Sequence, residues 1–306
     1  MKYKFCSVLI FIYILFSSVI VNAQCPCSGG NAVGGLMHVT GSGNIGVLKK
    51  GNFRASAFYV YSYGNDYYAN DSKTNQGVLK EFSTSFLGFN FGYGINEDLT
   101  AEAELYSYPD KTQDYYYFKF ESSGFSHISL NLKYNIISLR SKELEWTIGA
   151  GGKIPFSTGT DLLPAAIQPS TGAYGFIVQS FLHKGFKDIG LHLILANRLE
   201  NNFENKDEYQ YGYSAVNSLF ITKSIIDNLA GVLEIRGDTR TRDKRYGDYI
   251  PDSGNNTIIL SPQIGYSFSG FSFSIMYDFP VYKYYFGRQL TKDYSAGAAI
   301  SWQTKL

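Results

Sequence analysis

The chain carries almost no net charge and few charged residues. Its formal net charge is +1, and Lys, Arg, Asp and Glu together make up 17% of the 306 residues. A balance this close to zero produces no long-range field toward nucleic acid or an acidic substrate. We therefore expect no nucleic-acid partner.

The sequence also lacks the motifs of common enzyme classes. No glycine-rich phosphate loop follows a strand and leads into a helix, and no pair of His residues has metal-ligand spacing. The Gly-x-Gly pieces at 41–43 and 92–94 lack a following helix and are turn or strand glycines. We predict no cofactor and no enzymatic activity, with one alternative described below.

Beyond the N-terminus there is no long apolar run. No later stretch approaches the roughly 20 consecutive apolar residues that a membrane-spanning helix needs. If the chain lies in a membrane, it must therefore cross as a β-barrel.

Residues 1–23 have the pattern of a secretory signal peptide. Lys2 and Lys4 precede the apolar run 8–16, and Ala23 ends a segment suited to cleavage before Gln24. The nearby Cys25 raises the alternative of a lipoprotein signal, but Gln24 occupies the position where lipid attachment requires Gly, Ala or Ser. We prefer cleavage and export.

Cysteine is scarce, and two of the three cysteines lie just after the predicted cleavage site. Cys25 and Cys27 would face an oxidising compartment, where a thiol pair can close or bind metal. A disulfide this short would be strained, and two thiolates are an incomplete metal site unless His38 or a second chain contributes. We prefer a flexible terminus without metal. The Gly-rich segment 24–50 is predicted either to hang in the periplasm or to plug a lumen.

Tyr and Gly are abundant, and from residue 51 onward apolar and small polar residues alternate. The chain has 26 Tyr and 31 Gly. In segments 260–268 and 271–279 every second residue is large and apolar, apart from Pro262, and most of the others are polar or Gly. A period of two indicates strands with one apolar and one polar face, and interfacial aromatic girdles account for the Tyr content.

We predict an all-β fold, an antiparallel up-and-down transmembrane β-barrel of about 12 strands over residues 51–306. Connections are alternately short and long. Short turns are periplasmic and long loops extracellular in such barrels, which places both termini in the periplasm. The predicted strands are Phe53–Tyr63, Phe82–Tyr93, Leu99–Tyr108, Phe125–Ile137, Glu145–Ile154, Tyr174–Leu182, Ile189–Arg198, Tyr211–Ile221, Leu229–Arg240, Thr257–Phe268, Phe271–Val281 and Tyr294–Trp302.

Alternation assigns the faces of each strand. Leu99, Ala101, Ala103 and Leu105 are predicted to face lipid, because the intervening carboxylates would be costly there. The same argument over the other strands gives these lumen-lining candidates: Arg54, Glu102, Glu104, His127, Ser129, Lys133, Glu145, Lys153, His192, Arg198, Glu234, Arg236, Asp238 and Asp278.

Acids and bases are mixed on this predicted inner face. The mixture fits a cross-barrel lattice of ion pairs that closes the pore, or a narrow polar passage. The first hypothesis is a passive outer-membrane channel for small, possibly hydrophobic solutes. The alternative is a closed structural or surface-recognition barrel.

One pair of residues suggests a third hypothesis, an outer-membrane lipid hydrolase. His127 and Ser129 lie two apart on one strand face, and barrel phospholipases use a His-x-Ser pair in which His accepts the Ser proton. Those enzymes hold the pair on the lipid-facing surface, whereas alternation here predicts it inside.

Three segments resemble a known family of outer-membrane transporter barrels, named after the meta-cleavage pathway of phenol degradation. Residues 124–134 resemble its Gly-x-Gly-Asp-x-x-Leu-x-x-Lys-Tyr strand, with His127 where the family usually has Asp. Residues 149–159 resemble its next strand with a Pro-Thr-Gly break, and residues 280–302 its C-terminal hairpin. The resemblance implies a barrel that passes small, often hydrophobic compounds, and it supplies no catalytic residues.

Export and a barrel fold together predict the bacterial outer membrane as the location. The expected partners are outer-membrane lipids, the barrel-assembly machinery and an unidentified small solute.

Overall fold

The computed structural model describes residues 23–24, 46–75, 79–139, 142–156, 163–226 and 228–305. Except for Ala23, the predicted signal segment lies outside these residues, as do Cys25, Cys27, His38 and most of segment 24–50. Within the described residues, no helix is long and apolar enough to cross a membrane.

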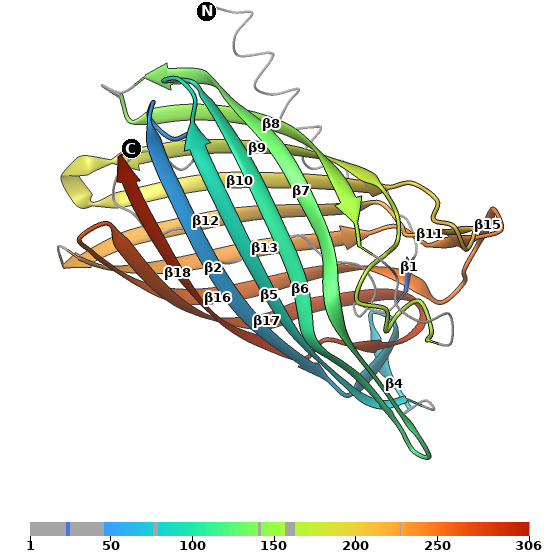
Figure 1. Ribbon diagram of the computed structural model, residues 1–306. Helices are drawn as coiled ribbons and strands as arrows, with labels where there is room; N and C mark the ends of the chain where they lie inside the picture. The colour runs from blue at the N-terminus through green and yellow to red at the C-terminus, as the bar shows by residue number, and fades with distance from the viewer. Residues whose placement is uncertain are drawn as a thin grey trace, which may run out of the picture.

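Twelve antiparallel strands form one closed barrel, which confirms the predicted fold class (Figure 1). Each strand pairs with its neighbours along the chain, and the last strand pairs with the first from Tyr294↔Tyr63 to Lys305↔Asn52. The strands are β2 (Asn52–Gly64), β5 (Leu79–Gly94), β6 (Leu99–Tyr115), β7 (Lys119–Leu139), β8 (Leu144–Pro155), β9 (Gly175–Phe186), β10 (Leu191–Asn202), β12 (Ser214–Ile226), β13 (Leu229–Arg240), β16 (Ser253–Phe268), β17 (Phe271–Thr291) and β18 (Tyr294–Lys305).

Short elements extend the barrel at one end. β3 (Asp66–Asn70) pairs with the far part of β17, and β4 (Ser72–Thr74) pairs with β3. β11 (Tyr209–Gln210), β14 (Lys244–Arg245) and β15 (Asp248–Tyr249) form a separate small sheet. β1 (Ala23–Gln24) pairs with the start of β16, and the 3₁₀ helix η2 (Lys187–Ile189) connects β9 to β10. Figure 1 shows β4, β11 and β15 at the end opposite the C-terminus, which is the end of the long loops.

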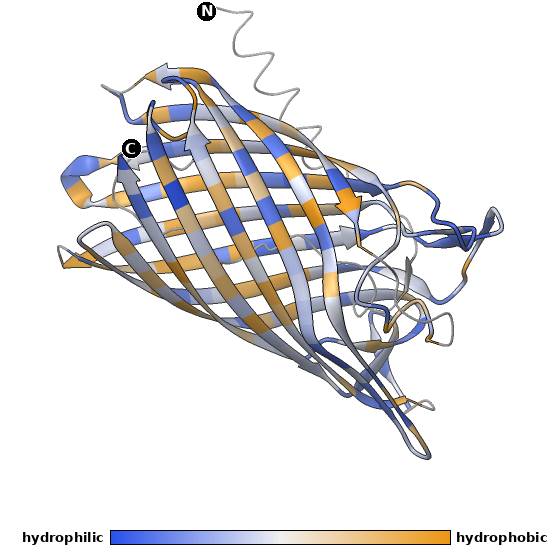
Figure 2. Ribbon diagram, viewed as in Figure 1, coloured by the Kyte–Doolittle hydropathy of each residue, from blue (hydrophilic) through white to orange (hydrophobic). Residues whose placement is uncertain are grey.

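The alternation of side chains around the barrel wall follows the predicted pattern. In β7, Ser129, Asn131 and Lys133 are buried, whereas Leu130 and Leu132 are 53% and 55% exposed. Figure 2 shows polar and apolar residues alternating along the strands. A wall of large exposed apolar side chains suits hydrocarbon and not water, because soluble monomers expose only small apolar patches.

Most strands are longer than the sequence predicts, and three of them exceed the prediction by seven residues or more. β6, β7 and β17 contain 17, 21 and 21 residues, although a tilted strand crosses the membrane in about 9–11 residues. Most of the predicted loops 109–124 and 282–293 is therefore strand. The β6–β7 hairpin turns only at residues 116–118 and projects beyond the barrel wall (Figure 1).

The chain just before β2 lies against the inner wall at the end of the short turns. Val47 and Leu48 are buried, and the backbone N–H of Leu48 donates to Oγ1 of Thr100, 2.7 Å away. The backbone comes so close to Gly94 that a Cβ there would lie 2.1 Å from the carbonyl oxygen of Lys49. This close approach requires glycine at position 94.

Candidate functional site

The candidate site is the charged interior of the barrel. Most of the predicted lumen-lining side chains are buried in the protein: Arg54, Glu102, Glu104, His127, Ser129, Lys133, Lys153, Glu234, Arg236 and Asp278. The others are half-buried: Glu145, His192, Arg198 and Asp238. Except for Glu145, the charged Asp, Glu, Lys and Arg members form three clusters.

The first cluster is centred on Glu102 of β6. Its carboxylate lies 3.1 Å from Nη2 of Arg54 on β2 and 2.7 Å from Nζ of Lys133 on β7. Arg54 and Glu102 sit on strands that are not neighbours, and Gly92 of the intervening β5 pairs with both. Because Gly92 has no side chain, the guanidinium can pass over it to reach the carboxylate.

The second cluster joins β6 and β8 to β10. Arg198 of β10 donates two hydrogen bonds to Glu104 of β6, at 3.2 and 3.0 Å, although three strands separate them around the wall. This pair therefore crosses the interior as a chord and does not follow the wall. A bidentate guanidinium–carboxylate pair is also the strongest common geometry for such a contact.

Lys153 of β8 forms the other half of this cluster. Its Nζ lies 2.5 Å from the carboxylate of Glu200 and 2.6 Å from Oδ1 of Asn202, both on β10. Lys153 and Asn202 both pair with Gly175 of β9, so a missing side chain again permits a contact between strands that are not neighbours.

The third cluster surrounds Arg236 of β13. Its guanidinium lies 3.4 Å from Glu234, 3.3 Å from Asp238 and 2.5 Å from Asp278 of β17. Lys292 adds a second cation 3.9 Å from Asp278. Ser218 and Gln263 donate hydrogen bonds to Glu234, at 2.7 and 3.2 Å.

Several members of these clusters fall outside the sequence prediction. Glu200 and Asn202 lie in the predicted loop after Arg198, and Lys292 lies in the predicted loop before the last strand. His183 lies in a predicted turn, yet it is buried and its Nε2 is 3.1 Å from Nδ1 of His192. The alternation rule finds Glu200, Asn202 and His183 only if their strands are first extended far enough, whereas Lys292 lies in the connection between β17 and β18.

The geometry gives no support to a Ser–His hydrolase. The Ser129 hydroxyl donates to Glu104, 2.7 Å away, and Nδ1 of His127 contacts the Ser126 hydroxyl at 3.0 Å. The His127 ring packs on Tyr106 with centroids 4.7 Å apart. Both side chains are buried inside the barrel, away from the lipid-facing surface where a barrel lipase works. Among the described residues there is also no group of three or more potential metal ligands.

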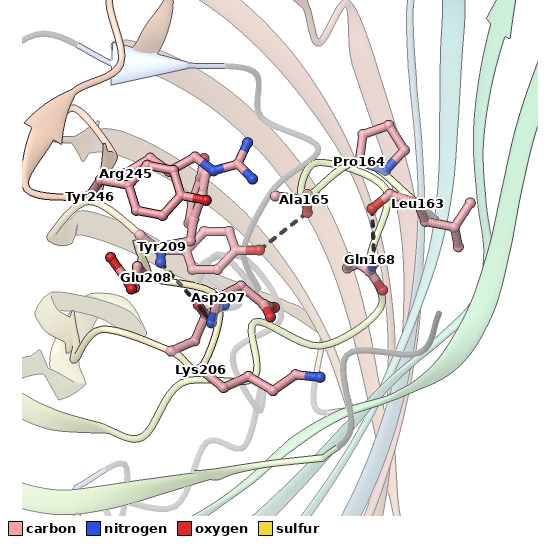
Figure 3. Close-up of a pocket in the computed structure, with 12 residues that line it drawn as sticks. Leu163, Pro164, Ala165, Gln168, Lys206, Asp207, Glu208, Tyr209, Arg245 and Tyr246 are labelled. Carbon is pink, nitrogen blue, oxygen red and sulfur yellow. Dashed lines mark hydrogen bonds between the residues drawn. The ribbon is translucent and has the colours of Figure 1, made fainter. Parts of the chain in front are cut away.

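A pocket of about 620 Å³ opens among the long loops (Figure 3). Its lining comes from three separate connections, between residues 163 and 168, between 205 and 211, and at 245–246. Figure 3 shows Arg245 and Tyr246 on one side of the pocket and Leu163 and Pro164 on the other.

Asp243 holds two of these three connections together. Its carboxylate is fully buried and accepts hydrogen bonds from the Tyr209 hydroxyl at 2.6 Å, the Gly212 N–H at 2.7 Å and Arg240 at 2.6 Å. Burial, with the nearby Asp243 charge, raises the pKa of the Tyr209 hydroxyl far above its usual value. Tyr209 therefore stays protonated and remains a donor over the physiological pH range.

Replacing Asp243 with alanine should loosen this loop assembly and leave the barrel intact. Losing the equivalent of even one hydrogen bond to a charged group, about 1.5–3 kcal/mol, should raise local opening by at least roughly tenfold to a hundredfold. Limited trypsin digestion at Lys206, Arg242 and Lys244 measures this rate. The Asp248→Ala variant, which alters an exposed carboxylate in the same connection, should be cleaved like the unaltered protein.

Comparisons with known proteins agree with the fold. A profile of the family described as "Putative MetA-pathway of phenol degradation" matches residues 61–291. This range includes the segments 124–134 and 149–159 that carry the sequence resemblance, and it ends before the last strand. No curated protein sequence matches the chain.

Solved structures share the barrel at low sequence identity. An outer membrane channel from Pseudomonas putida F1 aligns with a TM-score of 0.70 and 12% identity, over 86% of this chain and 99% of the channel. A Pseudomonas aeruginosa FadL homologue aligns with a TM-score of 0.45 and 9% identity, over 93% and 98% of the two chains. The CymD monoaromatic hydrocarbon channel aligns with a TM-score of 0.42 and 13% identity, over 95% of this chain and 99% of that channel. Only the first score supports a shared fold.

Proposed function

The chain belongs to the family described as "Putative MetA-pathway of phenol degradation", and it has the fold of an outer membrane channel. On this basis we propose that it is a passive channel for small solutes. The observation that carries this proposal is the inner face of the barrel. It is built of paired polar and charged side chains, which suit a narrow polar passage.

The pairing of charges favours neutral solutes. Each buried acid of the three clusters contacts a base, so the described interior presents no ring of one sign. Rings of one sign are the usual basis of ion selectivity, and their absence among these residues predicts weak selectivity. We infer that uncharged, partly hydrophobic solutes are the natural cargo, as the family description also suggests.

The export route is part of the proposal. The N-terminal segment 1–23 would direct the chain through the inner membrane and be removed, and the barrel-assembly machinery would insert the strands among outer-membrane lipids.

Uptake into proteoliposomes tests whether the protein is a channel and whether the Glu104–Arg198 pair restricts passage through it. The refolded protein should admit phenol and glycerol faster than protein-free vesicles, with a reversal potential near zero in a KCl gradient. The double variant Glu104→Ala/Arg198→Ala should raise the uptake rate roughly threefold or more, because it removes two side chains that cross the interior. The matched control is Lys80→Ala/Asp114→Ala, which deletes a partly exposed ion pair on β5 and β6 outside the three clusters.

Two results would contradict this proposal. One is the absence of uptake and conductance in both the unaltered protein and the chord variant. The other is an equal rise of uptake in the control variant, because that would assign the effect to general loosening of the barrel.

A further inference from the structure

We propose that the pocket among the long loops binds a neutral saccharide. The proposal is independent of the channel function, since the pocket lies outside the three charged clusters of the interior. Its volume of about 620 Å³ falls in the usual range for small-molecule sites.

The lining has the chemistry that a sugar requires. Tyr246 is 65% exposed and supplies an aromatic ring on which the C–H face of a pyranose can pack, and the buried Tyr209 and Tyr211 line the floor. The side chains of Asp207, Glu208 and Arg245 are exposed and offer planar donors and acceptors for hydroxyl groups.

Other ligand classes fit this lining less well. Lys206 and Arg245 are balanced by Asp207 and Glu208, so the pocket has no net charge to attract an ion. A purely hydrophobic solute would displace water from the exposed charged side chains of Asp207, Glu208 and Arg245, which is costly. A neutral ligand rich in hydroxyl groups avoids both penalties.

The floor of the pocket is fixed before any ligand arrives. Tyr209 is held by Asp243, and its backbone N–H donates to Oδ1 of Asn205 at 3.1 Å. The Tyr211 hydroxyl donates to the carbonyl oxygen of Ala165, 3.2 Å away, and so ties two connections together. Such preorganisation lowers the entropy lost on binding.

Backbone strain singles out the same place. Among the described residues, five that are not glycine have positive φ, and two of these, Glu208 (54°) and Tyr246 (55°), line this pocket. The backbone N–H of Tyr246 donates to the carbonyl oxygen of Glu208 at 3.0 Å, so the two strained residues are joined. Strained residues of this kind gather at functional sites.

Tyr246 is the more informative of the two. Tyr246 and Gly247 form the two-residue turn between β14 and β15, and both have positive φ. Turns of this type favour Asn, Asp or Gly at the first position, and a bulky aromatic residue is unusual there. A tyrosine that costs the turn stability is explained if its ring is needed in the pocket.

The Tyr246→Asn variant separates binding from structure, because Asn is the better turn residue. The probes are maltotriose and a neutral hexose oligosaccharide of the lipopolysaccharide outer core, each titrated into the refolded full-length protein by calorimetry and saturation-transfer NMR. Tyr246→Asn should weaken saccharide binding about tenfold or more and leave the thermal unfolding temperature unchanged or higher. The matched control is Tyr249→Asn, which removes an exposed tyrosine of the same hairpin outside the pocket lining.

The two probes distinguish the possible sources of the ligand. Binding of the core oligosaccharide alone indicates glycolipid of the surrounding membrane, and binding of maltotriose alone indicates free glycan; either supports the proposal. It is overturned if neither probe binds the unaltered protein, or if Tyr246→Asn binds like Tyr249→Asn. Solute uptake should be unaffected by Tyr246→Asn, so failure here leaves the channel proposal standing.

Discussion

Replacing Arg236 with leucine should lower the free energy of unfolding by about 3–5 kcal/mol, the usual cost of breaking a buried ion pair by removing one partner. Arg236 contacts Glu234, Asp238 and Asp278 together, and its side chain is 4% exposed. Without it, like charges would remain close together in the interior with Lys292 as the nearest cation, 3.9 Å from Asp278. Urea titration of the barrel refolded in lipid vesicles measures the change.

A matched variant shows whether burial causes this effect. Lys119→Leu removes the cation of an exposed pair with Glu121 at the projecting β6–β7 hairpin, where the two side chains are 50% and 59% exposed. Exposed pairs contribute roughly 0–1 kcal/mol, so this variant should unfold almost like the unaltered protein. Equal losses in the two variants would contradict the idea that the interior charges hold the wall together.

Replacing Leu132 with arginine should prevent stable insertion, or cost about 2–4 kcal/mol where the barrel still forms. Leu132 points outward from β7 and is 55% exposed. It pairs with Ala150, which lies near the middle of β8, so its side chain sits near the centre of the hydrocarbon layer. Recovery of the heat-modifiable folded band from outer-membrane fractions measures assembly.

The control variant also introduces an arginine, but at a position outside the hydrocarbon layer. Tyr117 is 97% exposed at the tip of the β6–β7 hairpin. Tyr117→Arg should assemble at the normal level, because an arginine in water carries no desolvation cost. Normal assembly of Leu132→Arg would be incompatible with a lipid-facing β7 surface.

The position of the membrane explains why some strand ends could be predicted from the sequence and others could not. Within the membrane each strand must alternate, and the predicted starts of β6 at Leu99 and β17 at Phe271 are correct. Beyond the membrane no hydrocarbon imposes an apolar face, so polar stretches such as 109–115 read as loop although the ladder hydrogen bonds continue. Glu200 and Asn202 escaped the sequence prediction for this reason, whereas Lys292 lies in the short connection between β17 and β18.

The sequence by itself determined the number of strands, their direction and the alternation of polar and apolar faces within each predicted strand, because a two-residue period is a local property that each strand carries alone. Only the tertiary structure decided which charges meet. Closure of the cylinder brings Arg198 of β10 onto Glu104 of β6, and the bare glycines 92 and 175 let Arg54 and Lys153 reach past a neighbouring strand. The saccharide pocket likewise needs three connections that are far apart in the chain, and no pattern within any one of them specifies the other two.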